Sequence, residues 1–135
     1  LNETGSPDIV LFSSPGGNDF LSGSASIDQV ISNINEIVDI IQANNPNVII
    51  VIEELAPGMT SFMTAELTTN FNLMKDEVKT IANEQTTSTS LVITVDMHTG
   101  FGDELLADNV HYNAEGAKFI ADRYYNKLIT VLKSE

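Results

Sequence analysis

Three apolar segments of strand length, each followed by a segment with helical periodicity, limit what this chain can fold into. The apolar segments are residues 8–13, 48–52 and 91–95. Between and after them, apolar residues recur three or four positions apart, as they do on one face of an amphipathic helix. Alternation of strands and helices predicts a parallel sheet covered on both faces. We therefore expect a three-layer α/β/α fold with a flavodoxin-like sheet.

The helices can be placed from their periodicity and capping signals. Apolar residues mark the first helix over residues 27–41, and Ser26 with Gln29 forms a capping box at its start. A second stripe runs over residues 67–81, and a last helix starts near Asn113. The stripes indicate packing against a sheet rather than a cofactor site or a coiled coil.

The chain of 135 residues is long enough for one domain with a modest core. Three strands are few for a doubly covered parallel sheet, and no strand precedes Asp8. One edge of the first strand should then carry unpaired amides. We expect another segment to cover this edge. We expect residues 1–135 to be the C-terminal portion of a single domain whose first strands are absent from this chain.

Composition excludes several classes of function. The chain has 6 basic and 19 acidic residues, for a formal net charge of -13, so we expect no nucleic acid partner. It has no cysteine, which excludes disulfides, thiolate metal sites and a cysteine nucleophile. The longest apolar run, residues 48–52, is too short for a membrane span. An extracellular or periplasmic location is compatible with these features and is the location we expect.

Two polar clusters fall at the carboxyl ends of the predicted strands, where open α/β sheets bind ligands. The first is residues 16–19, Gly-Gly-Asn-Asp, and the second is residues 108–111, Asp-Asn-Val-His. An Asp three residues before a His in a turn can hold Nδ1–H and leave Nε2 free to take a proton. Asn18 offers a neutral amide donor suited to an oxyanion formed during acyl transfer.

Both clusters resemble conserved blocks of the SGNH (GDSL-like) hydrolases, a family of serine esterases and lipases. Residues 16–19 are similar to the family's G-x-N-D block. Residues 108–111, continued by Tyr112, Asn113 and Gly116, are similar to its last block, D-x-x-H. The resemblance covers the whole chain and implies an SGNH hydrolase fold. It also implies that His111 is the general base, that Asp108 orients it, and that Asn18 donates to the oxyanion hole, with no cofactor.

One departure from the family concerns the nucleophile. The family's serine lies in a G-D-S block, and a second block contributes a glycine amide to the oxyanion hole. Neither block occurs in this chain. We therefore expect the serine to lie outside it, in a missing N-terminal segment of the same protein that pairs with the first strand. Residues 95–101 resemble members that deacetylate carbohydrates, so acetyl or short-chain acyl esters are the expected substrates.

Two other functions remain open from the sequence. A non-catalytic binding module could keep this fold without a nucleophile. A metal-dependent hydrolase could use five residues of one loop as ligands: Asp96, His98, Asp103, Asp108 and His111. His98 is also a rival base, although a place on the rim or against substrate suits it better. Glu53 and Glu54 are expected to form a solvated pair near the cleft.

Overall fold

Three parallel strands form the middle layer of the molecule, as the sequence predicts. The computed structural model describes residues 5–132. Its strands are β1 (Ile9–Phe12), β2 (Ile49–Glu54) and β3 (Leu91–Asp96), and they lie in the order β1-β2-β3. All run in the same direction, so their carboxyl ends meet at one edge of the sheet.

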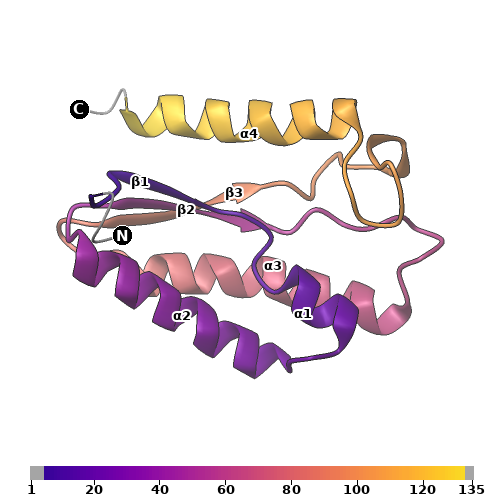
Figure 1. The fold of residues 1–135 in the computed structure, drawn as a ribbon, viewed down its shortest axis with the longest axis horizontal. Helices are drawn as coiled ribbons and strands as arrows, with labels where there is room; N and C mark the ends of the chain where they lie inside the picture. The colour runs from indigo at the N-terminus through magenta and orange to yellow at the C-terminus, as the bar shows by residue number, and fades with distance from the viewer. Residues whose placement is uncertain (1–4, 133–135) are drawn as a thin grey trace.

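Helices cover both faces of this sheet (Figure 1). On one face lie α2 (Ile27–Asn44) and α3 (Ala65–Gln85), and on the other lies α4 (Ala114–Leu132). This arrangement confirms the three-layer α/β/α fold. No helix within residues 5–132 is both long and apolar enough to cross a bilayer.

The long helices on the first face start at side-chain caps. The Ser26 hydroxyl accepts the Gln29 amide at 3.3 Å at the start of α2, and Thr64 Oγ1 accepts the Leu67 amide at 3.1 Å at the start of α3. These bonds satisfy amide groups that a helix leaves unpaired in its first turn. The predicted capping box is half formed, because the Gln29 side chain donates to Asn33 Oδ1 at 2.9 Å instead of turning back to Ser26.

The core is divided by the sheet into two clusters. The larger lies between the sheet and helices α2 and α3, and includes Ile50 and Ile52 of β2. The smaller lies under α4 and includes Val51 of β2 and Val95 of β3. Successive residues of β2 thus point to opposite faces, and both faces are buried, as in other parallel sheets covered by helices.

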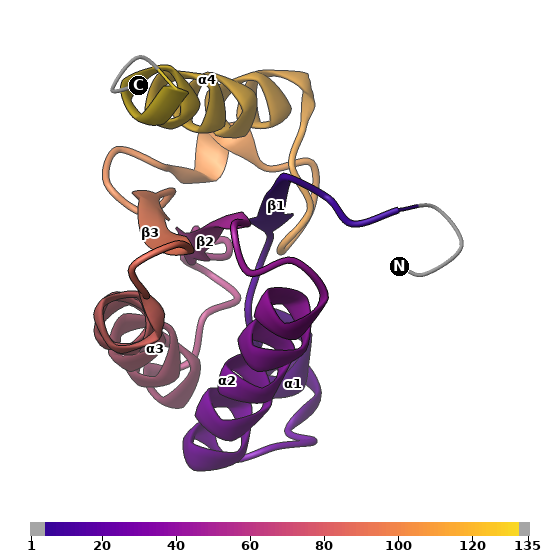
Figure 2. The same cartoon turned by 90° about the vertical axis from the view of Figure 1, so that its left-hand side faces the viewer.

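Strand β1 is covered less completely than the other two. It pairs only with β2 among the described residues. Its side chains Val10 and Phe12 pack into the larger cluster, but Ile9 and Leu11 belong to neither cluster, and Leu11 is 46% exposed. Figure 2 shows β1 at the outer edge of the sheet. The side of β1 away from β2 is thus open, as expected from the sequence. Its face towards α4, which carries Ile9 and Leu11, is also left uncovered by the described residues.

Candidate active site

The residues predicted to be catalytic converge at the carboxyl edge of the sheet. A cavity of about 290 Å³ lies there, lined by the segment after β1, the segment after β2 and the turn before α4. Asn18 and His111 both line it, although 93 positions separate them in the sequence (111 minus 18). The full lining is Ser13, Ser14, Gly17, Asn18, Leu21, Ala56, Pro57, Gly58, Phe71, Val110, His111 and Tyr112.

The Asp108 carboxylate folds back onto the His111 ring. His111 Nδ1 lies 2.8 Å from Asp108 Oδ2 and 3.0 Å from Oδ1. The backbone amides of Val110 and His111 also donate to Oδ1, at 2.9 and 2.8 Å. These hydrogen bonds lower the pKa of Asp108 to about 2. The two backbone amides contribute most, and the His111 ring contributes less. The ionised carboxylate favours the tautomer with its proton on Nδ1, which leaves Nε2 as the acceptor.

This acid–base pair lies near the surface of the molecule. The His111 side chain is 78% exposed and that of Asp108 is 56% exposed. The ring therefore does not turn into the core, and solvent or a ligand can reach it.

The turn that carries His111 is tied to its surroundings by backbone bonds. The Ala107 amide donates to the His111 carbonyl at 2.7 Å, and the Asn109 carbonyl accepts the Met59 amide at 2.8 Å. At the start of α4, Asn113 Oδ1 accepts the Gly116 amide at 2.9 Å. The turn is thus fixed at its centre to the segment after β2 and at its end to the last helix.

Asn18 lies in a short helix, α1 (Gly17–Ser22), that follows a tight turn after β1. The turn contains two left-handed residues, Ser14 with φ 47° and Gly16 with φ 76°. A side chain is strained at such φ values, which favours glycine at position 16. Asn18 is exposed, and its side-chain amide has no hydrogen-bond partner among the described residues. It is free to donate to a ligand in the cavity.

The expectation that Glu53 and Glu54 form a solvated pair is wrong. They extend β2 by two residues and are 1% and 7% exposed. Because successive strand residues face opposite sides, Glu54 points to α3, where it accepts from Thr94 Oγ1 at 2.7 Å and pairs with Lys79 Nζ at 3.2 Å.

Glu53 points to the α4 side and supports the turn before Asn18. Its Oε2 accepts the Ser14 amide at 2.7 Å and the Ser13 hydroxyl at 3.1 Å. Its Oε1 and the Tyr124 hydroxyl are buried without a hydrogen-bond partner among the described residues. Burial, with the Glu53 charge second, raises the pKa of Tyr112 to about 12, and burial and Glu53 also raise that of Tyr124. Both phenols thus remain protonated at neutral pH.

The five residues considered as metal ligands do not gather into one site. Asp96 accepts the amides of His98 and Thr99, both at 2.8 Å, while Asp103 accepts from Thr60. Within residues 5–132, no three His, Asp or Glu side chains come together as a metal site requires. The ligand set that the metal hypothesis needs is therefore absent from the described part of the chain.

Comparison with solved structures confirms the resemblance to esterases. A carbohydrate esterase family 3 structure from Talaromyces cellulolyticus matches with a TM-score of 0.82 and 29% identity, over 96% of this chain. A serine-to-alanine mutant of an acetyl esterase with acetate ion matches with a TM-score of 0.81 and 28% identity, over 95%. The chain spans 60% of the length of each. No family model and no curated protein matches the sequence.

Proposed function

We propose that this chain supplies the base, the orienting acid and one oxyanion donor of a serine esterase. The observation that carries the proposal is the single cavity lined by Asn18 and His111, with Asp108 bound to the far side of the ring. A proton acceptor and a neutral amide donor facing one space are the two elements that acyl transfer needs besides a nucleophile. The likeness to esterases of similar fold gives further support.

In the proposed mechanism, the nucleophilic serine hydroxyl attacks the ester carbonyl while His111 Nε2 takes its proton. The carbonyl oxygen becomes an oxyanion and accepts a hydrogen bond from the Asn18 amide. Asp108 stabilises the imidazolium through Nδ1–H. As the tetrahedral intermediate collapses, His111 returns the proton to the alcohol oxygen, the C–O bond breaks, and the acyl group remains on the serine. Water, activated by the same imidazole, then releases the acid.

The described serines near the cavity are poor candidates for this nucleophile. Ser13 donates its hydroxyl to Glu53 at 3.1 Å, and the Ser14 side chain packs against Gly17. Neither has a hydrogen bond to an imidazole among the described residues.

We propose instead that a segment outside this chain pairs with the free edge of β1 and brings the serine to the cavity. The bare face around Leu11, 46% exposed, and the 60% coverage of the similar structures support this. The proposed arrangement makes residues 1–135 the C-terminal portion of one domain.

Acetyl esters of carbohydrates are the substrates we propose. One similar structure is a carbohydrate esterase, and the other is an acetyl esterase with acetate ion. The cavity lined by Asn18 and His111 has a volume of about 290 Å³, which suits a small acyl group better than a long chain. We also propose a location outside the cell or in the periplasm, where carbohydrate esters would be reached.

The test uses the protein expressed from its whole coding sequence, here called the whole protein. We expect it to release acetate from a sugar acetate and to be labelled by a fluorophosphonate on one serine. His111→Ala should lower the rate on the order of 10³-fold or more without unfolding the protein. Thr69→Ala, on the α3 surface outside the cavity, is the matched control and should keep full activity.

Two results would contradict the proposal. Activity of His111→Ala close to wild type would exclude the acid–base pair. A whole protein that hydrolyses no ester and resists the fluorophosphonate would instead be the non-catalytic binding module.

A further inference from the structure

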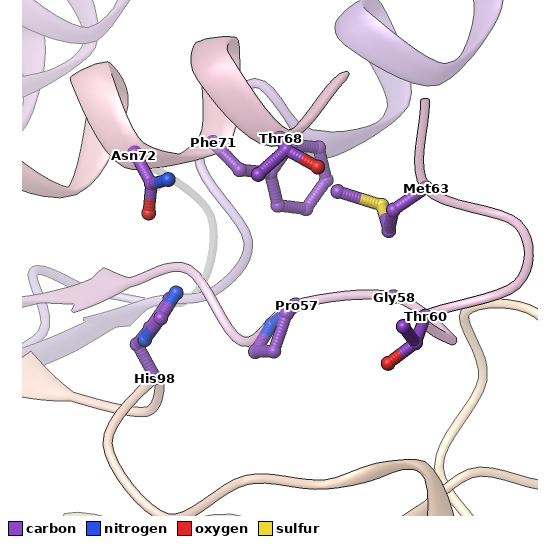
Figure 3. Close-up of a pocket in the computed structure, with 8 residues that line it drawn as sticks. All are labelled: Pro57, Gly58, Thr60, Met63, Thr68, Phe71, Asn72 and His98. Atoms are coloured by element: carbon purple, nitrogen blue, oxygen red, sulfur yellow. The ribbon is translucent and has the colours of Figure 1, made fainter. Parts of the chain in front are cut away.

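A second cavity lies beside the proposed catalytic one. Its volume is about 330 Å³, and it opens between the first turns of α3 and the segment after β2, with His98 at one end (Figure 3). In the figure, Phe71 and Asn72 approach from α3, while Pro57 and the His98 ring lie across from them. The mechanism proposed above uses none of the polar groups in this cavity.

The two cavities adjoin each other. Pro57, Gly58 and Phe71 line both of them. The same segment is bound to the turn that carries the base, since the Met59 amide donates to the Asn109 carbonyl at 2.8 Å. A ligand that is too large for the catalytic cavity would meet the second one next, beyond Pro57 and Gly58.

The direction of the reaction indicates which part of an ester would extend there. His111 must reach the alcohol oxygen to return the proton, so the alcohol leaves on the side of the base. The segment after β2 lies on that side, because it is held to the turn of residues 108–111. The alcohol part thus faces the second cavity, while the carbonyl oxygen faces Asn18.

The lining of the second cavity combines apolar surface with uncommitted polar groups. The His98 ring and the Asn72 amide have no hydrogen-bond partner among the described residues. Burial and the nearby Lys75 lower the pKa of His98, which keeps the ring neutral at neutral pH, with one donor and one acceptor nitrogen. Pro57 adds flat apolar surface, and Phe71, 5% exposed, adds a smaller area. Hydroxyl groups and C–H faces alternate in the same way around a sugar ring.

We propose that this second cavity is the subsite for the alcohol part of the ester, a sugar or similar polyol held by His98 and Asn72 and packed on Pro57. The proposal rests on the proposed esterase function. An apolar acyl chain fits the site less well, because it would bury the His98 and Asn72 polar groups without hydrogen-bond partners. His98, considered from the sequence as a rival base, is then a residue that determines specificity.

The experiment compares two acetyl esters that differ only in their alcohol. The probes are methyl 2-O-acetyl-β-xylopyranoside, which keeps two free hydroxyls, and ethyl acetate, whose two-carbon alcohol offers no hydroxyl to His98 or Asn72. In the whole protein, His98→Ala and Asn72→Ala should each lower kcat/KM for the sugar ester about fivefold to tenfold, mainly through KM. Both variants should hydrolyse ethyl acetate within about twofold of wild type, and His98→Asn should restore part of the loss. Thr69→Ala should change neither.

Three outcomes would contradict the proposal that the alcohol part binds in the second cavity. Equal losses on both esters would indicate a general structural role for these residues. Unchanged sugar-ester kinetics would show that the alcohol does not bind there. A changed preference between acetate and butyrate esters of one alcohol would make the cavity an acyl pocket.

A binding measurement separates failure of the subsite from failure of the esterase function. The His98 ring signals are those missing from the NMR spectrum of His98→Ala, and the His111 signals are identified in the same way with His111→Ala. Titration with unacetylated methyl β-xylopyranoside should shift the His98 signals. A shift in a whole protein that hydrolyses no ester would contradict the esterase function and keep the subsite. Absence of a shift in a whole protein that hydrolyses esters would contradict the subsite and keep the esterase function.

Discussion

Substitution of Gly116 by alanine should destabilise the protein, although alanine is normally preferred in a helix. Alanine in place of glycine inside a helix contributes about 1 kcal/mol of stability. At position 116 the added Cβ would lie 2.1 Å from the Leu105 carbonyl oxygen and 3.2 Å from the Tyr112 Cβ. Real Cβ atoms essentially never lie within 3.0 Å of such a neighbour, so α4 and the 3₁₀ turn at Asp103–Leu105 must move apart.

The net effect follows from comparing the two terms. Overpacking of a buried site costs about 1–3 kcal/mol, and a backbone carbonyl yields less readily than the end of a side chain, so the upper half of that range applies. After the helix-propensity gain we expect Gly116→Ala to lower the free energy of unfolding by about 1–2 kcal/mol. The Leu105 carbonyl also accepts the Asn113 amide at 3.0 Å, so the shift should disturb the turn that carries His111 as well.

Urea unfolding followed by circular dichroism measures this change. Ala117→Gly, at the next, exposed position of α4, is the matched control and should lose about 1 kcal/mol from propensity alone. If Gly116→Ala is as stable as wild type or more stable, the close approach of α4 to the 3₁₀ turn does not exist and the reasoning fails.

Three further predictions concern the two loops of the site. Glu53→Ala should lower the free energy of unfolding by about 1–3 kcal/mol, because the Ser14 amide and Ser13 hydroxyl lose their buried acceptor. Glu53→Gln keeps an acceptor oxygen and should lose less in the same urea titration; equal losses would count against this role. Asp108→Asn should lower kcat of the whole protein on the order of 10³-fold, because Oδ1 can still hold the turn but Nδ1–H loses its ionised acceptor; a rate near wild type would exclude the orienting role. The Asp108 pKa of about 2 lies below the value near 4 expected in the unfolded chain, so the stability it contributes is complete above about pH 4 and is lost as pH falls towards 2. Carboxyl ¹³C NMR should show this titration near pH 2, and a midpoint near 4 would mean that the turn is not formed.

The strands could be predicted as short apolar runs because the sheet is buried on both faces, and the three long helices could be predicted because each buries one continuous stripe. The strands predicted at residues 48–52 and 91–95 match β2 and β3 to within two residues at each end, and the helix predicted at residues 27–41 lies inside α2. The pairing of Asp108 with His111 also followed from local sequence, since a turn of four residues fixes the distance between the first and last side chains. These features depend on neighbours in the chain.

Features that depend on contacts between distant segments could not be predicted. Glu53 and Glu54 follow five apolar residues and so suggested a strand end, but each has a partner about 40 residues away, in Ser14 and Thr94. The short α1 has only six residues, too few to show a helical period, and its start depends on the left-handed Gly16. The second cavity arises only where α3 passes the segment after β2.

The most direct test of the central claim is a crystal structure of the whole protein after reaction with a fluorophosphonate. We expect an adduct on a serine outside residues 1–135, in a segment paired with β1. Its phosphoryl oxygen should accept a hydrogen bond from the Asn18 side chain, and the His111 ring should stand beside the adduct with Nδ1 still bound to Asp108. An adduct on another face of the sheet, or a phosphoryl oxygen that Asn18 does not reach, would contradict it.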